Sequence, residues 1–323
     1  MSVWAIAIHG GAGRKLVSPK DQSILKELHR IVLETSGLLR KGASALDAAE
    51  HATYLLEDSG LFNAGRGSCL TAQGTPELEA GICRGEDFAT GSVLRVTDYA
   101  HPIRLARFIL EHTDMVSMHG DRALELMAPR DRRDRRGLIT PEKLALWRRL
   151  LKDADGEQSS LRKHHPHTHR QVLKSPQYLR QKKIGTVGAV ARDSAGHFAA
   201  ANSTGGFWLK LPGRIGDSPV FGAGYYASPA GAAVTTGVGE LTLRSHLCRS
   251  VVEQMGALPA QAAVEAAFQE LERLFGSDNA GVIAVDSASR IGVWHNTPGM
   301  GHAFLTQRMK APVVRAVVPG KQE

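Results

Sequence analysis

A glycine followed by a threonine, Gly185-Thr186, lies just after the midpoint of the 323-residue chain and opens a strand of small residues that ends at Ala191. If the peptide bond between them were cleaved, Thr186 would carry a free α-amine close to its own hydroxyl. Such an amine has a pKa of about 7.7–8.0 in peptides, so part of it is the free base near neutral pH. It can accept the hydroxyl proton while the oxygen attacks a carbonyl, which makes one residue both nucleophile and base.

Gly185 suits the position before a cleaved bond because a residue without a Cβ tolerates strained dihedral angles that expose its carbonyl. The same residues also fit the start of a buried strand with no chemical role. Taken alone, they favour the buried strand. The remaining candidate residues reverse that preference.

A second candidate is the loop from Gly213 to Pro219, in which Arg214 and Asp217 lie three residues apart. A guanidinium binds a carboxylate through two hydrogen bonds and an aspartate suits an ammonium, so this loop could hold a small zwitterion. The simpler alternative, which these residues alone favour, is that Arg214 and Asp217 pair with each other on the surface.

A third candidate is the segment from Thr235 to Glu240, which includes Thr236 and Gly237 and precedes a predicted helix over 240–254. A threonine hydroxyl and backbone N–H groups at a helix N-terminus are well placed to stabilise a developing oxyanion.

The formal net charge of +8 raises the question of nucleic-acid binding. Much of the basic excess lies in 130–136 and 162–183, and aromatic residues that could stack on bases are not interleaved with it. We interpret it as solvated linker charge and expect no nucleic-acid partner. Four histidines within 164–169 have no carboxylate nearby, which indicates at most an adventitious metal site.

The composition is that of a soluble protein, because 42% of residues are hydrophobic and no apolar run approaches 18 residues. The N-terminus lacks the features of a signal peptide, so we expect a cytoplasmic protein with no membrane association. Cys69, Cys83 and Cys248 are odd in number and lack metal-binding spacing, which predicts buried free thiols rather than a disulfide or a zinc site.

Hydrophobic periodicity predicts helices around 24–39, 46–56, 102–112, 240–254 and 259–275. It predicts strands over 1–8, 186–192, 198–202, 281–286 and 292–296, with short strands between 69 and 100. We expect a tight turn at His9 to Gly13, and a turn-rich loop from Leu56 to Ser68. Residues 152–183 read as a flexible linker whose end delivers Gly185 and Thr186.

Six segments, in this order, resemble the plant-type L-asparaginase and isoaspartyl peptidase family of N-terminal nucleophile hydrolases. They are Ile8 to Gly13, Leu61 to Gly65, Gly185 to Ala191, Ser203 to Gly206, Gly213 to Pro219 and Thr236 to Glu240. Each is a weak signal alone, but the six follow one another in the expected order over about 230 residues, and the resemblance extends over nearly the whole chain.

The resemblance implies an α+β fold, specifically a four-layer αββα sandwich, made as a precursor and cleaved before Thr186. Residues 1–185 would form an α chain and 186–323 a β chain of the same domain. Two such heterodimers would then form a homodimer. The implied activity is hydrolysis of L-asparagine or β-aspartyl dipeptides to L-aspartate, with no cofactor needed for the chemistry.

The resemblance also implies roles for individual residues. Thr186 matches the nucleophile and Thr204 a threonine that hydrogen-bonds near it. Arg214 and Asp217 match the residues that take the substrate α-carboxylate and α-amine. The oxyanion donors match Thr236 and Gly237, a pocket glycine matches Gly239, and an asparagine that supports the nucleophile region matches Asn63.

The loop from Leu56 to Arg66 matches one that binds a sodium ion through backbone carbonyls. In this chain the carbonyls would be those of Leu56, Glu57, Ser59, Phe62, Ala64 and Arg66.

Four residues depart from the usual family pattern. Glu79 and Arg84 stand where aspartates are common, Val238 where threonine is, and Thr235 where cysteine is. We expect these differences to affect substrate preference and cleavage rate rather than the core roles.

Three alternatives stay open. Glycosylasparaginase shares the nucleophile chemistry, although Lys183-Ile184 precedes Gly185 where a His-Asp pair is expected. An inactive scaffold would remain uncleaved. A nucleic-acid binder that used the basic run 130–136 would show steep salt dependence.

Overall fold

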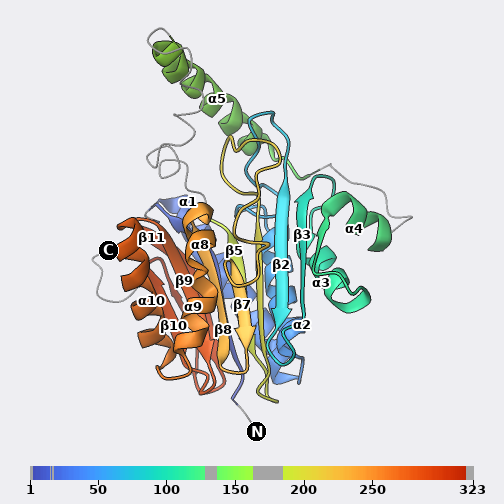
Figure 1. Ribbon diagram of the computed structural model, residues 1–323, viewed down its shortest axis with the longest axis vertical. Coiled ribbons are helices and arrows are strands. Elements are labelled where there is room, and N and C mark those ends of the chain that lie inside the picture. The colour runs from blue at the N-terminus through green and yellow to red at the C-terminus, as the bar shows by residue number, and fades with distance from the viewer. Residues whose placement is uncertain (1–2, 15, 17, 128–136, 163–184, 318–323) are drawn as a thin grey trace.

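The computed structural model describes residues 3–14, 16, 18–127, 137–162 and 185–317 (Figure 1). They form a mixed α/β structure with two sheets. The eight-stranded sheet has the order β12-β11-β1-β5-β6-β2-β3-β4, and the four-stranded sheet has the order β10-β9-β8-β7.

The strands of the eight-stranded sheet are β1 (Ala5–Gly13), β2 (Leu78–Arg84), β3 (Thr90–Val96), β4 (Ser117–His119), β5 (Val187–Arg192), β6 (Phe198–Thr204), β11 (Gly299–Thr306) and β12 (Val313–Arg315). Those of the four-stranded sheet are β7 (Tyr225–Ser228), β8 (Gly231–Gly237), β9 (Ala280–Asp286) and β10 (Ile291–His295). The helices are α1 (Pro19–Arg40), α2 (Ala45–Asp58), α3 (Pro102–His112), α4 (Gly120–Met127), α5 (Pro141–Arg162), α8 (Gly239–Ser245), α9 (Leu247–Gln254) and α10 (Ala260–Phe275).

The N-terminal strand β1 lies between two strands from the second half of the chain. It pairs antiparallel with β5, where Ala7 stands opposite Val190, and with β11, where Ala7 stands opposite Phe304. Because β6 also pairs with β2, the halves before and after Gly185 build one continuous sheet.

Alternation along the strands divides the buried side chains between two cores. Val187 and Ala189 of β5 pack with residues of α1, α2 and α3, whereas Val190 packs against residues of the four-stranded sheet such as Val234. The other face of the four-stranded sheet, which includes Ala233, packs against α9 and α10. Burial of both faces of each central strand explains why these segments read as runs of small apolar residues.

Several predicted elements are confirmed. The structure has the predicted helices α1, α2, α3 and α10, and the strands β5, β6, β9 and β10. The Ser44 side chain accepts the backbone N–H of Asp47 at 3.1 Å, which is the helix cap expected from their spacing.

The predicted tight turn at His9 to Gly13 is wrong. These residues continue β1, with an irregular register between His9 and Ala12 where Gly11 adopts a φ of 106°. The strand continues because Ala12 still pairs with Met300 of β11. The glycine spacing within His9 to Gly13 carries no information about this distant partner.

The predicted helix over 240–254 is interrupted at His246, whose φ and ψ of 46° and 48° are left-handed. It therefore forms two helices, α8 and α9. The segment from Thr235 to Gly237, expected at the helix start, ends strand β8 instead. The predicted strands end with β9 and β10, whereas the structure continues with β11 and β12.

Part of the predicted linker is helical, since α5 continues to Arg162 and so includes 152–162. Its first half is anchored by Leu144, Trp147 and Leu150, which lie against a small core containing Leu70 and Trp208. Residues 163–184 lie outside the described residues, as do the basic run 130–136 and the histidine run 164–169.

Within the described residues, no helix is both long enough and apolar enough to span a bilayer. Cys69, Cys83 and Cys248 are buried free thiols, as expected.

The left-handed backbone at His246 gives a test of the helix break. We expect His246→Gly to raise the free energy of unfolding by about 1 kcal/mol, because glycine lacks the Cβ that makes this conformation costly. Ser245→Gly, one residue earlier and within α8, should lower it by about 1 kcal/mol. Thermal unfolding of both variants checks this, and equal losses in the two would contradict it.

Candidate active site

Three neighbouring strands place polar side chains in a row at one end of the gap between the sheets. Across β2 and β6, Glu79 pairs with Thr204, and across β5 and β6, Val187 pairs with Ser203. Thr186, the residue before Val187, therefore stands beside Thr204. Since Val187 faces the helices, strand alternation turns Thr186 toward the second sheet.

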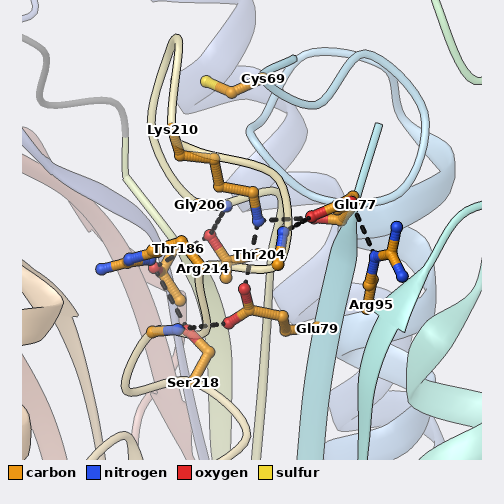
Figure 2. A network of polar contacts seen from close by, with 12 residues as sticks. Cys69, Glu77, Glu79, Arg95, Thr186, Thr204, Gly206, Lys210, Arg214 and Ser218 are labelled. Carbon is orange, nitrogen blue, oxygen red and sulfur yellow. Dashed lines mark hydrogen bonds and ion pairs between the residues drawn. The ribbon is translucent and has the colours of Figure 1, made fainter. Parts of the chain in front are cut away.

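The Thr186 hydroxyl lies in a chain of hydrogen bonds (Figure 2). It donates to Thr204 Oγ1 at 3.3 Å and accepts from the Ser218 hydroxyl at 3.5 Å. Thr204 Oγ1 also accepts the backbone N–H of Gly206 at 3.0 Å. Ser218 was not singled out from the sequence, and its only signal there was its place in the loop from Gly213 to Pro219.

Gly185, the residue before Thr186, lies in close backbone contact with Gly11, in the irregular part of β1. A Cβ placed on Gly185 would lie 1.9 Å from Gly11 Cα, and one placed on Gly11 would lie 2.3 Å from Gly185 Cα. Neither position has room for a side chain. This contact fixes the backbone of the Gly185-Thr186 segment on a neighbouring strand.

Thr186 opens into a pocket that brings together most of the residues predicted from the sequence. Its lining consists of Thr186, Thr204, Gly206, Phe207, Arg214, Asp217, Gly237, Val238, Gly239 and Glu240. Thr236 and Asn63 are not among the lining residues, although Thr236 directly precedes Gly237 of the lining. A hydroxyl, a guanidinium and a carboxylate therefore share one small cavity.

Arg214 pairs with Glu240 rather than with Asp217. Its guanidinium lies 2.9 Å from Glu240 Oε1 and 4.8 Å from the centre of the Phe207 ring. The aromatic face and the carboxylate orient a side chain that is only 15% exposed. The surface pair of Arg214 with Asp217 considered from the sequence is therefore not formed.

Asp217 is buried beside the guanidinium, and burial raises its pKa to about 6. Its Oδ2 atom has no hydrogen-bond partner among the described residues. A buried carboxylate with an open acceptor is costly unless a ligand supplies a donor. An ammonium group in the pocket would do so.

Gly239 keeps space open between these two charged groups. A Cβ at this position would lie 2.8 Å from the Arg214 Nη2 atom and 2.8 Å from Asp217 Oδ1. Only glycine lets the guanidinium and the carboxylate approach the pocket from both sides.

Thr236 and Gly237 end strand β8, on the sheet opposite Thr186. The backbone N–H of Ala12 donates to Thr236 Oγ1 at 3.2 Å, so the hydroxyl proton of Thr236 remains available for a further acceptor. Gly237 has a φ of 144°, and a Cβ there would lie 2.3 Å from the carbonyl oxygen of Asn279.

Asn63 supports the turn that follows Thr204 without lining the pocket. Its Nδ2 atom donates to the Gly206 carbonyl at 2.6 Å, and its Oδ1 atom accepts the backbone N–H of Cys69 at 2.7 Å. The backbone N–H of Gly205 donates to the Asn63 carbonyl at 3.0 Å. The loop from Leu56 is thereby tied to the site.

The loop predicted to bind sodium folds back on itself around Gly65. The Leu56 carbonyl accepts the Ser59 hydroxyl at 3.0 Å, and the Glu57 carbonyl accepts the Arg66 N–H at 2.9 Å. A Cβ on Gly65 would lie 2.6 Å from the Glu57 carbonyl oxygen and 2.5 Å from that of Ala100. Two carbonyl oxygens, those of Glu57 and Ala100, therefore lie close to Gly65, and the Glu57 carbonyl already accepts a hydrogen bond from the loop itself.

No group of three or more His, Cys, Asp or Glu side chains is positioned to hold a metal ion in the part of the chain that the structure describes. This absence concerns side chains only. The predicted sodium donors are backbone carbonyls, namely those of Leu56, Glu57, Ser59, Phe62, Ala64 and Arg66. Any ion here would rest on the backbone.

The sequence matches known proteins along nearly its whole length. The family model described as asparaginase matches residues 2–314. A plant-type L-asparaginase of Pyrococcus furiosus is 38% identical over 325 residues, which cover 95% of this chain and 98% of that protein. An isoaspartyl peptidase of Salmonella typhimurium is 36% identical, with coverage of 94% and 96%.

An isoaspartyl peptidase of Escherichia coli is 37% identical, covering 93% of this chain and 92% of that protein. Both enzyme types therefore resemble this chain to a similar degree. With a family match from residue 2 to residue 314 and near-complete coverage in each relative, the chain belongs to the asparaginase family of hydrolases.

Proposed function

We propose that this protein hydrolyses L-asparagine and β-aspartyl dipeptides, releasing L-aspartate, with Thr186 as the nucleophile. The observation that carries the proposal is the pocket in which the Thr186 hydroxyl faces Arg214 and Asp217. Both substrate types share an aspartyl unit with an α-carboxylate, an α-ammonium and a side-chain carbonyl. One pocket can therefore serve both.

The fold that we propose is the four-layer αββα sandwich of N-terminal nucleophile hydrolases. Its support is the three cores, one between the two sheets and one beneath the helices on each outer side. In this arrangement 1–185 and 186–323 would be the α and β chains of one domain.

Cleavage before Thr186 would proceed by attack of its hydroxyl on the Gly185 carbonyl carbon. The contact between Gly185 and Gly11 supports this step because it restrains the scissile segment on β1. Migration of the acyl group from nitrogen to oxygen gives an ester, which water hydrolyses. The products are a carboxylate on Gly185 and a free α-amine on Thr186.

In the first half of the reaction, Arg214 would hold the substrate α-carboxylate and Asp217 its α-ammonium. The Thr186 hydroxyl attacks the side-chain carbonyl carbon while the α-amine takes the hydroxyl proton. The oxyanion would accept hydrogen bonds from the Thr236 hydroxyl and the Gly237 N–H. The leaving ammonia, or peptide amine, departs with the proton held on the α-ammonium, which leaves an acyl ester on Thr186.

In the second half, the same α-amine accepts a proton from water, which attacks the ester carbonyl. Collapse of the tetrahedral intermediate returns the proton to the Thr186 oxygen and releases L-aspartate. The Thr204 and Ser218 hydroxyls would orient Thr186 Oγ1 throughout. No cofactor takes part in either half.

The substrate carboxylate must compete with Glu240, which already pairs with Arg214. The Glu240 side chain is 38% exposed, so it can withdraw toward solvent at modest cost. The substrate would thereby exchange one carboxylate partner of Arg214 for another.

We further propose that two αβ heterodimers form a homodimer, that the substrate is a small molecule or dipeptide, and that nucleic acid is not a partner. We keep the prediction of a cytoplasmic location. Size-exclusion chromatography with light scattering tests the assembly.

Replacement of the nucleophile gives the direct test of the proposed activity. Wild-type protein should split into fragments 1–185 and 186–323, and it should release aspartate from asparagine and from β-aspartyl-leucine. Thr186→Ala should stay at full length and release none. Intact mass spectrometry and an aspartate assay measure both. Wild-type protein that stays whole and inactive would instead favour the scaffold alternative.

The raised pKa of Asp217 predicts how ligand binding depends on pH. Below about pH 6 the carboxyl group is protonated and cannot pair with an ammonium, so affinity for L-aspartate should rise about tenfold between pH 5 and pH 7. Succinate, which lacks the ammonium, should show no such gain. Inhibition constants measure both, and Asp217→Asn should remove the difference. Parallel profiles for the two ligands would contradict the assignment.

We also propose that the loop around Gly65 holds a sodium ion through the backbone carbonyls of Leu56, Glu57, Ser59, Phe62, Ala64 and Arg66. A bound ion stabilises the folded state, so the thermal midpoint should be higher in sodium chloride than in choline chloride at equal ionic strength. Gly65→Ala would fill the space next to the Glu57 and Ala100 carbonyls and should abolish the difference. Equal midpoints for wild-type protein in the two salts would rule the site out.

A further inference from the structure

A lysine with no exposed side-chain surface lies next to the site and takes no part in the proposed chemistry. Lys210 follows the turn after β6, and its Nζ atom donates to Glu79 Oε1 at 3.1 Å and to the Glu77 carbonyl at 2.8 Å (Figure 2). The Glu79 side chain is also fully buried. Burial of two charges is costly, so such a pair needs a reason beyond stability.

One reason is the anchoring of the loop that carries Arg214 and Asp217. The second oxygen of Glu79, Oε2, accepts the backbone N–H of Gly216 at 2.8 Å. Glu77 Oε2 accepts the backbone N–H of Gly213 at 2.7 Å. The carboxylates of Glu79 in β2 and of Glu77, directly before β2, therefore fix the loop backbone on either side of Arg214.

The same lysine also touches the turn that positions the nucleophile. A Cβ on Gly206 would lie 2.6 Å from Lys210 Cδ and 2.9 Å from its Nζ atom, so the lysine stem passes directly over this glycine. Gly206 donates to Thr204 Oγ1, which accepts the hydroxyl of Thr186. One buried ion pair thus contacts both halves of the pocket.

A surface arginine completes the charge balance. Arg95 Nε lies 2.8 Å from Glu77 Oε1, so two carboxylates face two cations. Arg95 has a left-handed φ of 58° and lies where the register between β2 and β3 shifts opposite Glu79. Backbone strain of this kind persists where surrounding contacts hold it, which here means the ion pair to Glu77.

We propose that the Glu79–Lys210 pair sets the spacing between the Thr186 hydroxyl and the Arg214–Asp217 clamp, and thereby the preference for ligands that carry both an α-carboxylate and an α-ammonium. The inference rests on the proposed function. Neither residue lines the pocket, so both are positioning residues.

The test uses Glu79→Gln, Lys210→Met and the double variant in the full-length, self-processed protein. Each single variant should raise KM for asparagine about tenfold and also lower kcat about tenfold, because both the clamp and its spacing from the Thr186 hydroxyl lose their geometry. Inhibition constants of L-aspartate, succinate and β-alanine report the clamp directly. The advantage of aspartate over the two analogues should fall about tenfold.

Stability separates positioning from a purely structural role. Each single variant leaves one buried charge unpaired, whereas the double variant leaves none, so the double should recover most of the lost thermal midpoint. Its raised KM and reduced preference for aspartate should remain, since methionine cannot donate the lysine hydrogen bonds. Val264→Ala, fully buried in α10, is the matched control: it should lower the midpoint and leave both binding measurements unchanged.

Four outcomes would overturn the proposal. They are single variants with wild-type KM and aspartate preference, a double variant that regains wild-type KM, a double variant that fails to fold, and a Val264→Ala variant that shifts both binding measurements. The third would make the pair a requirement of the core rather than of the site. Wild-type protein that releases no aspartate would instead refute the proposed function itself.

Discussion

The pairing of β5 with β1 and β6 is the interaction on which the rest of the site depends. It fixes which face of the sheet each residue of β5 occupies, and side chains alternate with a period of two. A slip of one residue would turn Thr186 toward the helices and Val187 into the gap between the sheets. The buried alanines and valines of β5 and β6 prevent that slip, because it would expose them or place them on the wrong face. The apolar pattern of the two strands therefore fixes the direction of Thr186, the polar residue directly before β5.

A second constraint is the burial of charge at the end of that gap. Asp217, Glu79 and Lys210 lie almost entirely out of solvent, and each needs a defined partner. Lys210 and Glu79 neutralise each other, whereas Asp217 Oδ2 has no partner among the described residues, and burial raises the pKa of Asp217. The pocket therefore holds one carboxylate, that of Asp217, which a cationic ligand would stabilise. The neighbouring buried charges of Lys210 and Glu79 already neutralise each other.

The sequence predicts the parts of this structure that depend on local pattern or on residue chemistry. Helices α1, α2, α3 and α10 and strands β5 and β6 have clear periodicity, and the glycine-flanked Thr186, Arg214 and Asp217 carry recognisable chemistry. Strands β7, β8, β11 and β12 lack such a pattern. Strand β8 consists mainly of glycine, alanine and threonine, β7 and β12 are only four and three residues long, and β11 contains two glycines. The continuation of β1 through His9 to Gly13 depends on pairing with Met300, nearly the whole chain away.

The same limit applies to side chains. The partner of Lys210 is 131 residues away in sequence, so nothing local marks the lysine as buried or Glu79 as its counter-ion. Likewise, Arg214 pairs with Glu240 although Asp217 is closer in sequence. The pairing depends on the position of the first turn of α8, which is set by the tertiary fold.

The topology also bears on the order of folding and cleavage. Strand β1, before the proposed cleavage point, lies between β5 and β11, which both follow it. The contact of Gly185 with Gly11 requires β1 and β5 to be paired already, so the scissile bond is held in place only after residues from both halves have come together. After cleavage of this bond, the strands of each half would remain paired with strands of the other half. The break adds a carboxylate on Gly185 and an α-amine on Thr186, and this amine is the base that the proposed chemistry needs.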